Sequence, residues 1–160
     1  MKLVSTDFNL VSLEDELRVD SLCRELLLEF YNQRVASGMS EHDATLLASS
    51  ADYFVRDYLV GARQLNILEI QGAEVRRFAG NWYIINTLEP DIADLERHLA
   101  GVREFFRFLA ENSAISYEVF AGIDSNCASL EFYKSRIEGF WNIQGDGYFE
   151  WERGCSLKND

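Results

Sequence analysis

The stretch LERHLAGVREFFRFL, residues 95–109, decides the fold class of this chain. At about 100° per residue, the apolar side chains of one stripe fall within about 40° of a single line along a helix. We therefore predict an amphipathic helix from about Asp91 to Asn112 that packs against other helices. The residues of the stripe are Leu95, Leu99, Val102, Phe106 and Leu109.

The far side of this helix carries three arginines with an aromatic residue beside them. Arginine next to an exposed aromatic ring is typical of protein interfaces and of phosphate contacts. The alternative is a solvated face whose aromatic residue is covered by a neighbouring helix, and we favour this alternative. With two arginines from the preceding helix, the candidate surface for a partner or for duplex DNA consists of Arg76, Arg77, Arg97, Arg103, Arg107 and Phe108.

Helical signals continue on both sides of this stretch. Ser40 is a suitable N-cap for a helix that ends at Gly61, with a buried stripe that includes Phe54 and Tyr58. Further helices are expected at about 14–37, 72–85, 117–122 and 125–140. The chain is therefore expected to be all-α, a bundle of four to six helices over residues 14–143, after an extended N-terminal arm at residues 1–13.

The tail, residues 144–160, follows a different pattern. Two aromatic runs are separated by Gly145-Asp146-Gly147, which predicts a short β-hairpin with a turn that needs positive φ. An irregular tail that packs its aromatic rings onto the bundle fits equally well. The same residues are a second candidate docking surface, although core packing is the safer interpretation. They are Trp141, Tyr148, Phe149 and Trp151.

Composition limits the classes of function. Hydrophobic residues make up 48% of the chain, enough for a core, and 27 acids against 15 bases give a net charge of −12. This charge repels nucleic-acid phosphates at long range. No 18-residue apolar run and no signal-peptide pattern occur, so neither a membrane span nor secretion is expected. Three scattered cysteines fit the reducing cytoplasm.

Catalytic motifs are missing. His42 and His98 have no cysteine or carboxylate partner at zinc-site spacing, and no Cys-x-x-Cys occurs. The serine nucleophile elbow and the glycine-rich phosphate loops are also lacking. We therefore expect no catalytic site, no bound metal and no cofactor, and the chain is not expected to be an enzyme.

Three stretches carry a resemblance to a known family. GMSEHDATLL at 38–47, LNILEIQGAEVRRF at 65–78 and the opening stretch at 95–109 resemble the helices of the N-terminal core-binding domain of tyrosine recombinases and phage integrases. The resemblance covers residues 24–112. It implies a four-helix domain that forms one half of a clamp around duplex DNA.

Two departures change what this resemblance implies. The catalytic half of the family uses an arginine, a His-x-x-Arg motif and a tyrosine nucleophile, whereas here Gly101 follows His98 at the arginine position. The residues after 112 leave no room for the rest, so recombinase activity is not expected. The second helix is also acidic where the family is basic, and binding to DNA depends on neutralised phosphates.

Three functions follow, in order of preference. The first is a non-catalytic interaction or regulatory domain with a core-binding-like fold, whose partner is another protein or a second copy of the chain. The second is a DNA-binding accessory protein that uses the five arginines of the third and fourth helices. The third is an enzyme of unidentified class.

Overall fold

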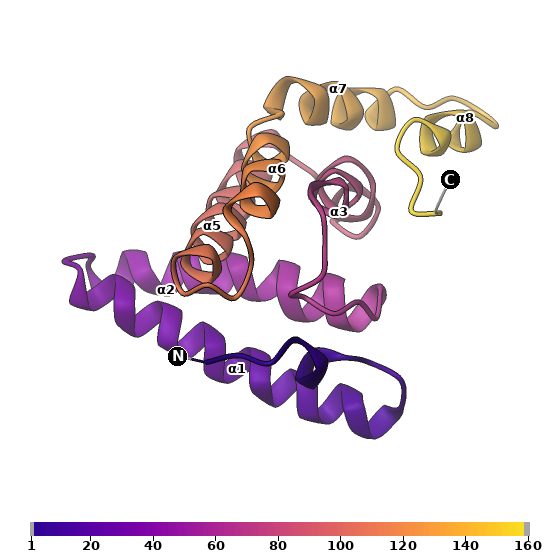
Figure 1. Ribbon diagram of the computed structural model, residues 1–160. Coiled ribbons are helices and arrows are strands. Elements are labelled where there is room, and N and C mark those ends of the chain that lie inside the picture. The colour runs from indigo at the N-terminus through magenta and orange to yellow at the C-terminus, as the bar shows by residue number, and fades with distance from the viewer. Residues whose placement is uncertain (1, 159–160) are drawn as a thin grey trace.

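The computed structural model describes residues 2–158, and its regular elements are all helical (Figure 1). No strand occurs within that range, so the expected all-α fold is confirmed. Two segments, η2 and η3, are π-helical, and η1 is a 3₁₀-helix. In chain order the elements are η1 (Ser5–Phe8), α1 (Leu13–Ala36), α2 (Glu41–Asp52), η2 (Tyr53–Ala62), α3 (Gly72–Arg77), η3 (Phe78–Trp82), α4 (Tyr83–Ile85), α5 (Ile92–Glu111), α6 (Tyr117–Cys127), α7 (Leu130–Trp141) and α8 (Tyr148–Arg153).

Polar side chains define where the helices begin. The hydroxyl of Ser40 accepts a hydrogen bond from the backbone N–H of Asp43 at 3.1 Å, so the predicted N-cap is confirmed. Ser12 forms a reciprocal capping box with Asp15 at the start of α1. Asp91 and Ser116 cap α5 and α6, and each side chain accepts one hydrogen bond from a backbone N–H of the first turn. These caps satisfy donors that a helix end would otherwise leave unpaired.

Two long helical stretches contain π-helical turns where they face each other. Glu41 to Ala62 runs as α2 and then η2, and Gly72 to Ile85 runs as α3, η3 and α4. The rings of Phe54 and Phe78 lie 5.0 Å apart, and those of Tyr58 and Trp82 lie 5.3 Å apart. Aromatic rings in edge-to-face contact therefore fill the space between the two π-helical segments.

α5 packs on two sides, against α2 and against α6. At its crossing with α2, a Cβ on Gly101 would lie 2.5 Å from the Cβ of Ser50 and 2.7 Å from the carbonyl oxygen of Leu47. Only glycine permits this close approach. Farther along α5, Phe105 and Phe108 pack on Phe30 of α1, with ring centroids 5.5 and 5.6 Å apart.

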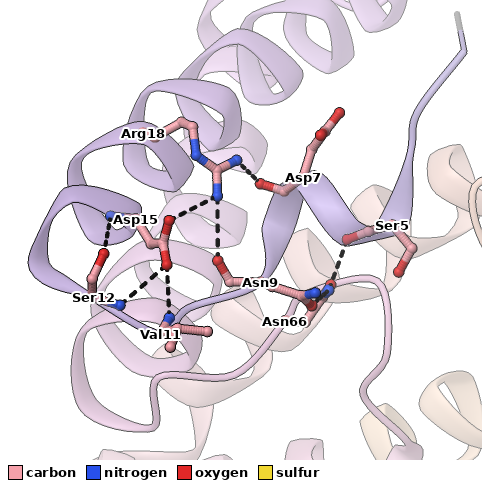
Figure 2. A network of polar contacts seen from close by, with 8 residues as sticks. All are labelled: Ser5, Asp7, Asn9, Val11, Ser12, Asp15, Arg18 and Asn66. Carbon is pink, nitrogen blue, oxygen red and sulfur yellow. Dashed lines mark hydrogen bonds and ion pairs between the residues drawn. The ribbon is translucent and has the colours of Figure 1, made fainter.

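The N-terminal segment forms hydrogen bonds with α1 and with Asn66 in the connector between η2 and α3 (Figure 2). Arg18 of α1 donates to the carbonyl oxygens of Asp7 and Asn9. The side-chain amide of Asn66 donates to the Ser5 carbonyl and to Asn9 Oδ1, both at 2.8 Å. The connector between η2 and α3 also holds the other end of the described chain, because Arg63 donates to the Leu157 carbonyl at 3.0 Å.

The tail contains a helix that neither of its two predicted forms included, although Trp151 packs onto the bundle as the second form expected. The β-hairpin is wrong, because α7 continues to Trp141 and the second aromatic run is the helix α8. Gly145 does adopt positive φ, at 57°, but the turn it makes joins two helices. The helical form is favoured because it turns Trp151 inward onto α7, as described below.

Candidate docking surface

Arg136 connects α7 to the rest of the bundle. Its side chain is buried, and its Nε donates to the Gly80 carbonyl of η3 at 2.9 Å. The guanidinium carbon lies 4.0 Å from the centroid of the Trp151 ring, close enough for a cation–π contact. Arg136 also donates to the Trp151 carbonyl. One buried arginine thus joins η3, α7 and α8.

Trp151 is the aromatic residue of the tail that belongs to the core. It is 8% exposed, and its indole Nε1–H donates to the Arg136 carbonyl at 2.8 Å. The candidate docking surface predicted from the sequence therefore loses Trp151, for which core packing is the correct interpretation. Through its contacts with Arg136, Trp151 holds α8 against α7.

Three of the four predicted aromatic residues remain accessible. Trp141 is 56% exposed, Tyr148 37% and Phe149 72%. Successive ring contacts of 5.1 to 6.2 Å join Phe149 to Tyr148, Tyr148 to Trp151, Trp151 to Phe140 and Phe140 to Trp141. We refer to Trp141, Tyr148 and Phe149 as the aromatic surface.

The segment of sequence that carries the aromatic surface is acidic. Between residues 138 and 153 there are four acids and one base, Arg153. Three of the acids are exposed, and the fourth is partly exposed. An apolar patch within a polar rim is the usual composition of a protein interface. The acids are Glu138, Asp146, Glu150 and Glu152.

The predicted arginine surface has a different environment. Arg103 forms an ion pair with Asp124 of α6 at 2.6 Å, and Arg107 lies over the Phe120 ring of the same helix at 5.4 Å. Arg97 pairs with Asp94 on its own helix. These side chains are engaged within the protein, chiefly with α6.

The two arginines of α3 are engaged elsewhere. Arg77 pairs with Glu74 at 2.9 Å, and Arg76 lies over the Phe132 ring of α7 at 4.5 Å. Phe108 is only 2% exposed, since α1 covers it, so this surface also lacks its aromatic residue. The expected covering of Phe108 by a neighbouring helix is confirmed.

One cluster with acid–base chemistry was not predicted. The Tyr83 hydroxyl donates to Asp94 Oδ2 at 2.7 Å, and His98 Nε2 lies 3.6 Å from the same oxygen. Burial lowers the pKa of His98 below its ordinary value, and Asp94 opposes this only in part. Within residues 2–158, His98 bonds to no serine, threonine or cysteine side chain, so the pair lacks an adjacent nucleophile.

No cluster of three or more His, Cys, Asp and Glu side chains within residues 2–158 is placed to hold a metal ion. No helix among them combines the length and the apolar character needed to cross a bilayer.

Sequence reasoning missed Arg136 and Phe140. Nothing in the spacing of residues 130–141 distinguishes a buried arginine from the exposed Lys134 on the same helix. The burial of Arg136 depends on Gly80, 56 residues earlier, and therefore on tertiary contacts.

Comparison of the chain with protein-family models, with curated proteins and with solved structures finds no significant match.

Proposed function

We propose that this chain is a non-catalytic interaction domain that binds a basic, partly apolar segment of a partner protein through the aromatic surface. The observation that carries the proposal is the exposure of Trp141 and Phe149 at 56% and 72% on helices that are fastened to the core. Arg136 and Trp151 hold α8 in place, so a partner meets a preorganised surface. Preorganisation reduces the entropy lost on binding.

The chemistry of the partner follows from the charge of the rim. The four acids that neighbour these rings in the sequence repel acidic segments and attract basic ones. Lysine and arginine also bind to the faces of tryptophan and phenylalanine rings. Tryptophan and tyrosine are common among the residues that contribute most to binding energy. A segment that combines basic and apolar side chains therefore fits both features of the surface.

Duplex DNA is the competing ligand, suggested by the recombinase resemblance of residues 24–112. Binding to DNA needs basic side chains that are free to neutralise phosphates. Arg77, Arg97 and Arg103 are paired with acids of this chain, and the net charge is −12. These observations support a protein ligand over a nucleic acid.

Tryptophan fluorescence tests the proposal directly. Trp141 is 56% exposed, whereas Trp151 is buried and Trp82 is partly buried, so Trp141 responds most to a ligand on the surface. A synthetic amphipathic helix of lysine and leucine is the probe. We expect a blue shift of emission on titration, and no shift with the matched peptide in which glutamate replaces each lysine.

Variants connect the signal to the surface. Phe149→Ala is expected to weaken binding of the lysine–leucine peptide at least about tenfold, as for a central aromatic residue of an interface. Tyr117→Ala is the matched control, because Tyr117 is a 64% exposed aromatic residue on α6. Equal binding by Phe149→Ala and the unaltered chain would overturn the proposal. Salt-sensitive retention of the chain on duplex DNA, abolished by Arg103→Glu, would favour the competing ligand.

A further inference from the structure

α1 exposes large apolar side chains on the side that faces away from the core. Its buried residues include Val19, Cys23 and Phe30. Leu13, Leu17 and Leu28 are 73%, 70% and 59% exposed, although leucine has no polar atom to present to water. Within one helix, exposed leucines in this number indicate an unpartnered face.

A heptad pattern runs along α1 beside the exposed leucines, and it includes Leu27, which is only 7% exposed and lines the groove described below. From residue 13 the spacing alternates between four and three, which is the a/d spacing of helices that pack side by side. The two central positions are charged and the four outer ones are apolar or aromatic. The positions are Leu13, Leu17, Asp20, Arg24, Leu27 and Tyr31.

This pattern is complementary to itself in one direction only. If a second copy of α1 lies antiparallel, centred on Leu22, then Leu13 faces Tyr31, Leu17 faces Leu27 and Asp20 faces Arg24. Each pair also occurs in reverse, as two-fold symmetry requires. In a parallel pair, Asp20 would face Asp20 and Arg24 would face Arg24, and facing like charges oppose association.

The structure provides a groove for the exposed leucines of the second copy. Leu27, Leu28 and Tyr31 of α1 line this groove together with Ala48 of α2. The antiparallel register places Leu13 and Leu17 of one copy over this groove of the other. The groove lies at the C-terminal half of α1, and the two leucines lie at its N-terminal half. In the antiparallel pair, the leucines of each copy therefore lie over the groove of the other copy.

We infer that this chain forms an antiparallel homodimer through α1, in which Leu13 and Leu17 of each copy enter the α1–α2 groove of the other. The central charges support the register. Asp20 is held by Arg56 at 2.8 Å, which orients its carboxylate. Arg24 also pairs with Asp20, at 3.2 Å, and its side chain is 66% exposed. In the dimer this arginine exchanges Asp20 of its own copy for Asp20 of the second copy.

Sedimentation analysis of the full chain tests for the dimer. We expect the mass to rise with concentration from 18.4 kDa toward twice that value. Leu17→Glu is expected to remain at 18.4 kDa with unchanged helical content, because Leu17 is exposed in the single chain. Tyr117→Ala is the control, because Tyr117 is 64% exposed on α6, and it is expected to dimerise as the unaltered chain does. A monomeric unaltered chain, or a Leu17→Glu variant that still dimerises, would overturn the inference.

Disulfide crosslinking tests the register. In the antiparallel pair, Leu17 of one copy lies about one residue from the level of Leu28 of the other, whereas Leu17 and its own counterpart are about 15 Å apart along the axis. Under mild oxidation the double variant Leu17→Cys/Leu28→Cys is expected to form covalent dimers, and each single variant is not. Covalent dimers of the single variants would show a parallel pair and overturn the inference. The aromatic surface is not involved, so this result is independent of the proposed function.

Discussion

Arg136 and Trp151 hold each other through their backbones and their side chains. The guanidinium lies 4.0 Å from the indole ring, Arg136 donates to the Trp151 carbonyl, and the indole donates to the Arg136 carbonyl. Because these contacts are reciprocal, neither residue can be replaced without releasing the other. The position of α8, and with it that of Tyr148 and Phe149 in the aromatic surface, depends on this pair.

Replacing Arg136 by leucine should therefore destabilise the protein by about 3 kcal/mol, since a buried hydrogen bond to a charged group contributes about 1.5 to 3 kcal/mol. Urea unfolding measures the loss. Lys134→Leu, on the exposed side of the same helix, is expected to change the free energy of unfolding by less than about 0.5 kcal/mol. Arg136→Lys should not restore stability, because lysine lacks the planar fork. Full stability in Arg136→Leu would show that α8 is held by other contacts.

Gly101 is expected to tolerate no side chain. A Cβ there would lie 2.5 Å from Ser50 Cβ and 2.7 Å from the Leu47 carbonyl oxygen, so α2 and α5 must separate. We expect Gly101→Ala to cost about 1 to 3 kcal/mol, measured by thermal or urea unfolding. Gly122→Ala in α6 is the matched control, since its nearest neighbour would be 4.0 Å away. There the helix propensity of alanine should leave stability unchanged or raise it by up to about 1 kcal/mol.

Phe108 and Phe149 should respond oppositely to truncation. Phe108 is 2% exposed and packs on Phe30, so Phe108→Ala is expected to cost about 3 to 5 kcal/mol. Phe149 is 72% exposed, and Phe149→Ala should leave the free energy of unfolding nearly unchanged. The two variants are compared by urea unfolding under the same conditions. Similar small losses in both would mean that α1 does not cover Phe108.

Glu74 should make stability depend on pH in the acid range. Its carboxylate is buried and accepts hydrogen bonds from Tyr58 at 2.9 Å and from Arg63 at 3.0 Å. Burial alone raises the pKa of Glu74, but the bonds from Arg63 and Tyr58 and the nearby positive charges outweigh it, so the pKa lies below its ordinary 4.5. Glu74 therefore contributes stability that is fully present above pH 4.5 and is lost as the pH falls through the folded pKa.

The matched variant isolates this contribution. Glu74→Gln should be less stable than the unaltered chain at neutral pH, because glutamine does not neutralise the arginines around it. The difference between the two proteins should shrink as the pH falls below 4.5 and through the lower pKa of folded Glu74, where its carboxylate becomes protonated. Urea unfolding from pH 3 to pH 7 measures it. A difference that stays constant across that range would contradict the assigned charge of Glu74.

The sequence predicted a helix correctly where a single face of that helix is buried against the rest of the bundle. The stripe from Leu95 to Leu109 predicted α5, and Ser40 predicted the start of α2; both are confirmed. Phe108 lies off that stripe, and its burial depends on Phe30, 78 positions earlier. The spacing of apolar residues within one helix does not show that a second helix, from another part of the chain, covers a residue outside the main stripe.

The candidate surface could be predicted only in part. The aromatic residues of the tail were found by composition, but their division into one buried and three exposed rings depends on Arg136. The hairpin was wrong because glycine permits a turn between helices as readily as one between strands. Ion pairs such as Arg103 with Asp124 also depend on tertiary contacts, so the arginines could not be recognised as engaged.

The connector between η2 and α3 also determines an order of events during synthesis. Ser5 contacts Asn66 across 61 positions, and Arg63 contacts Leu157 across 94. Contacts so distant in sequence form slowly, because long loops must close first. On the ribosome, the N-terminal segment must remain undocked until residue 66 has emerged. Arg63 can form its hydrogen bond to the Leu157 carbonyl only after residue 157 has emerged. In a nascent chain stalled before that residue, the connector would lack this contact and would be accessible to proteases and chaperones.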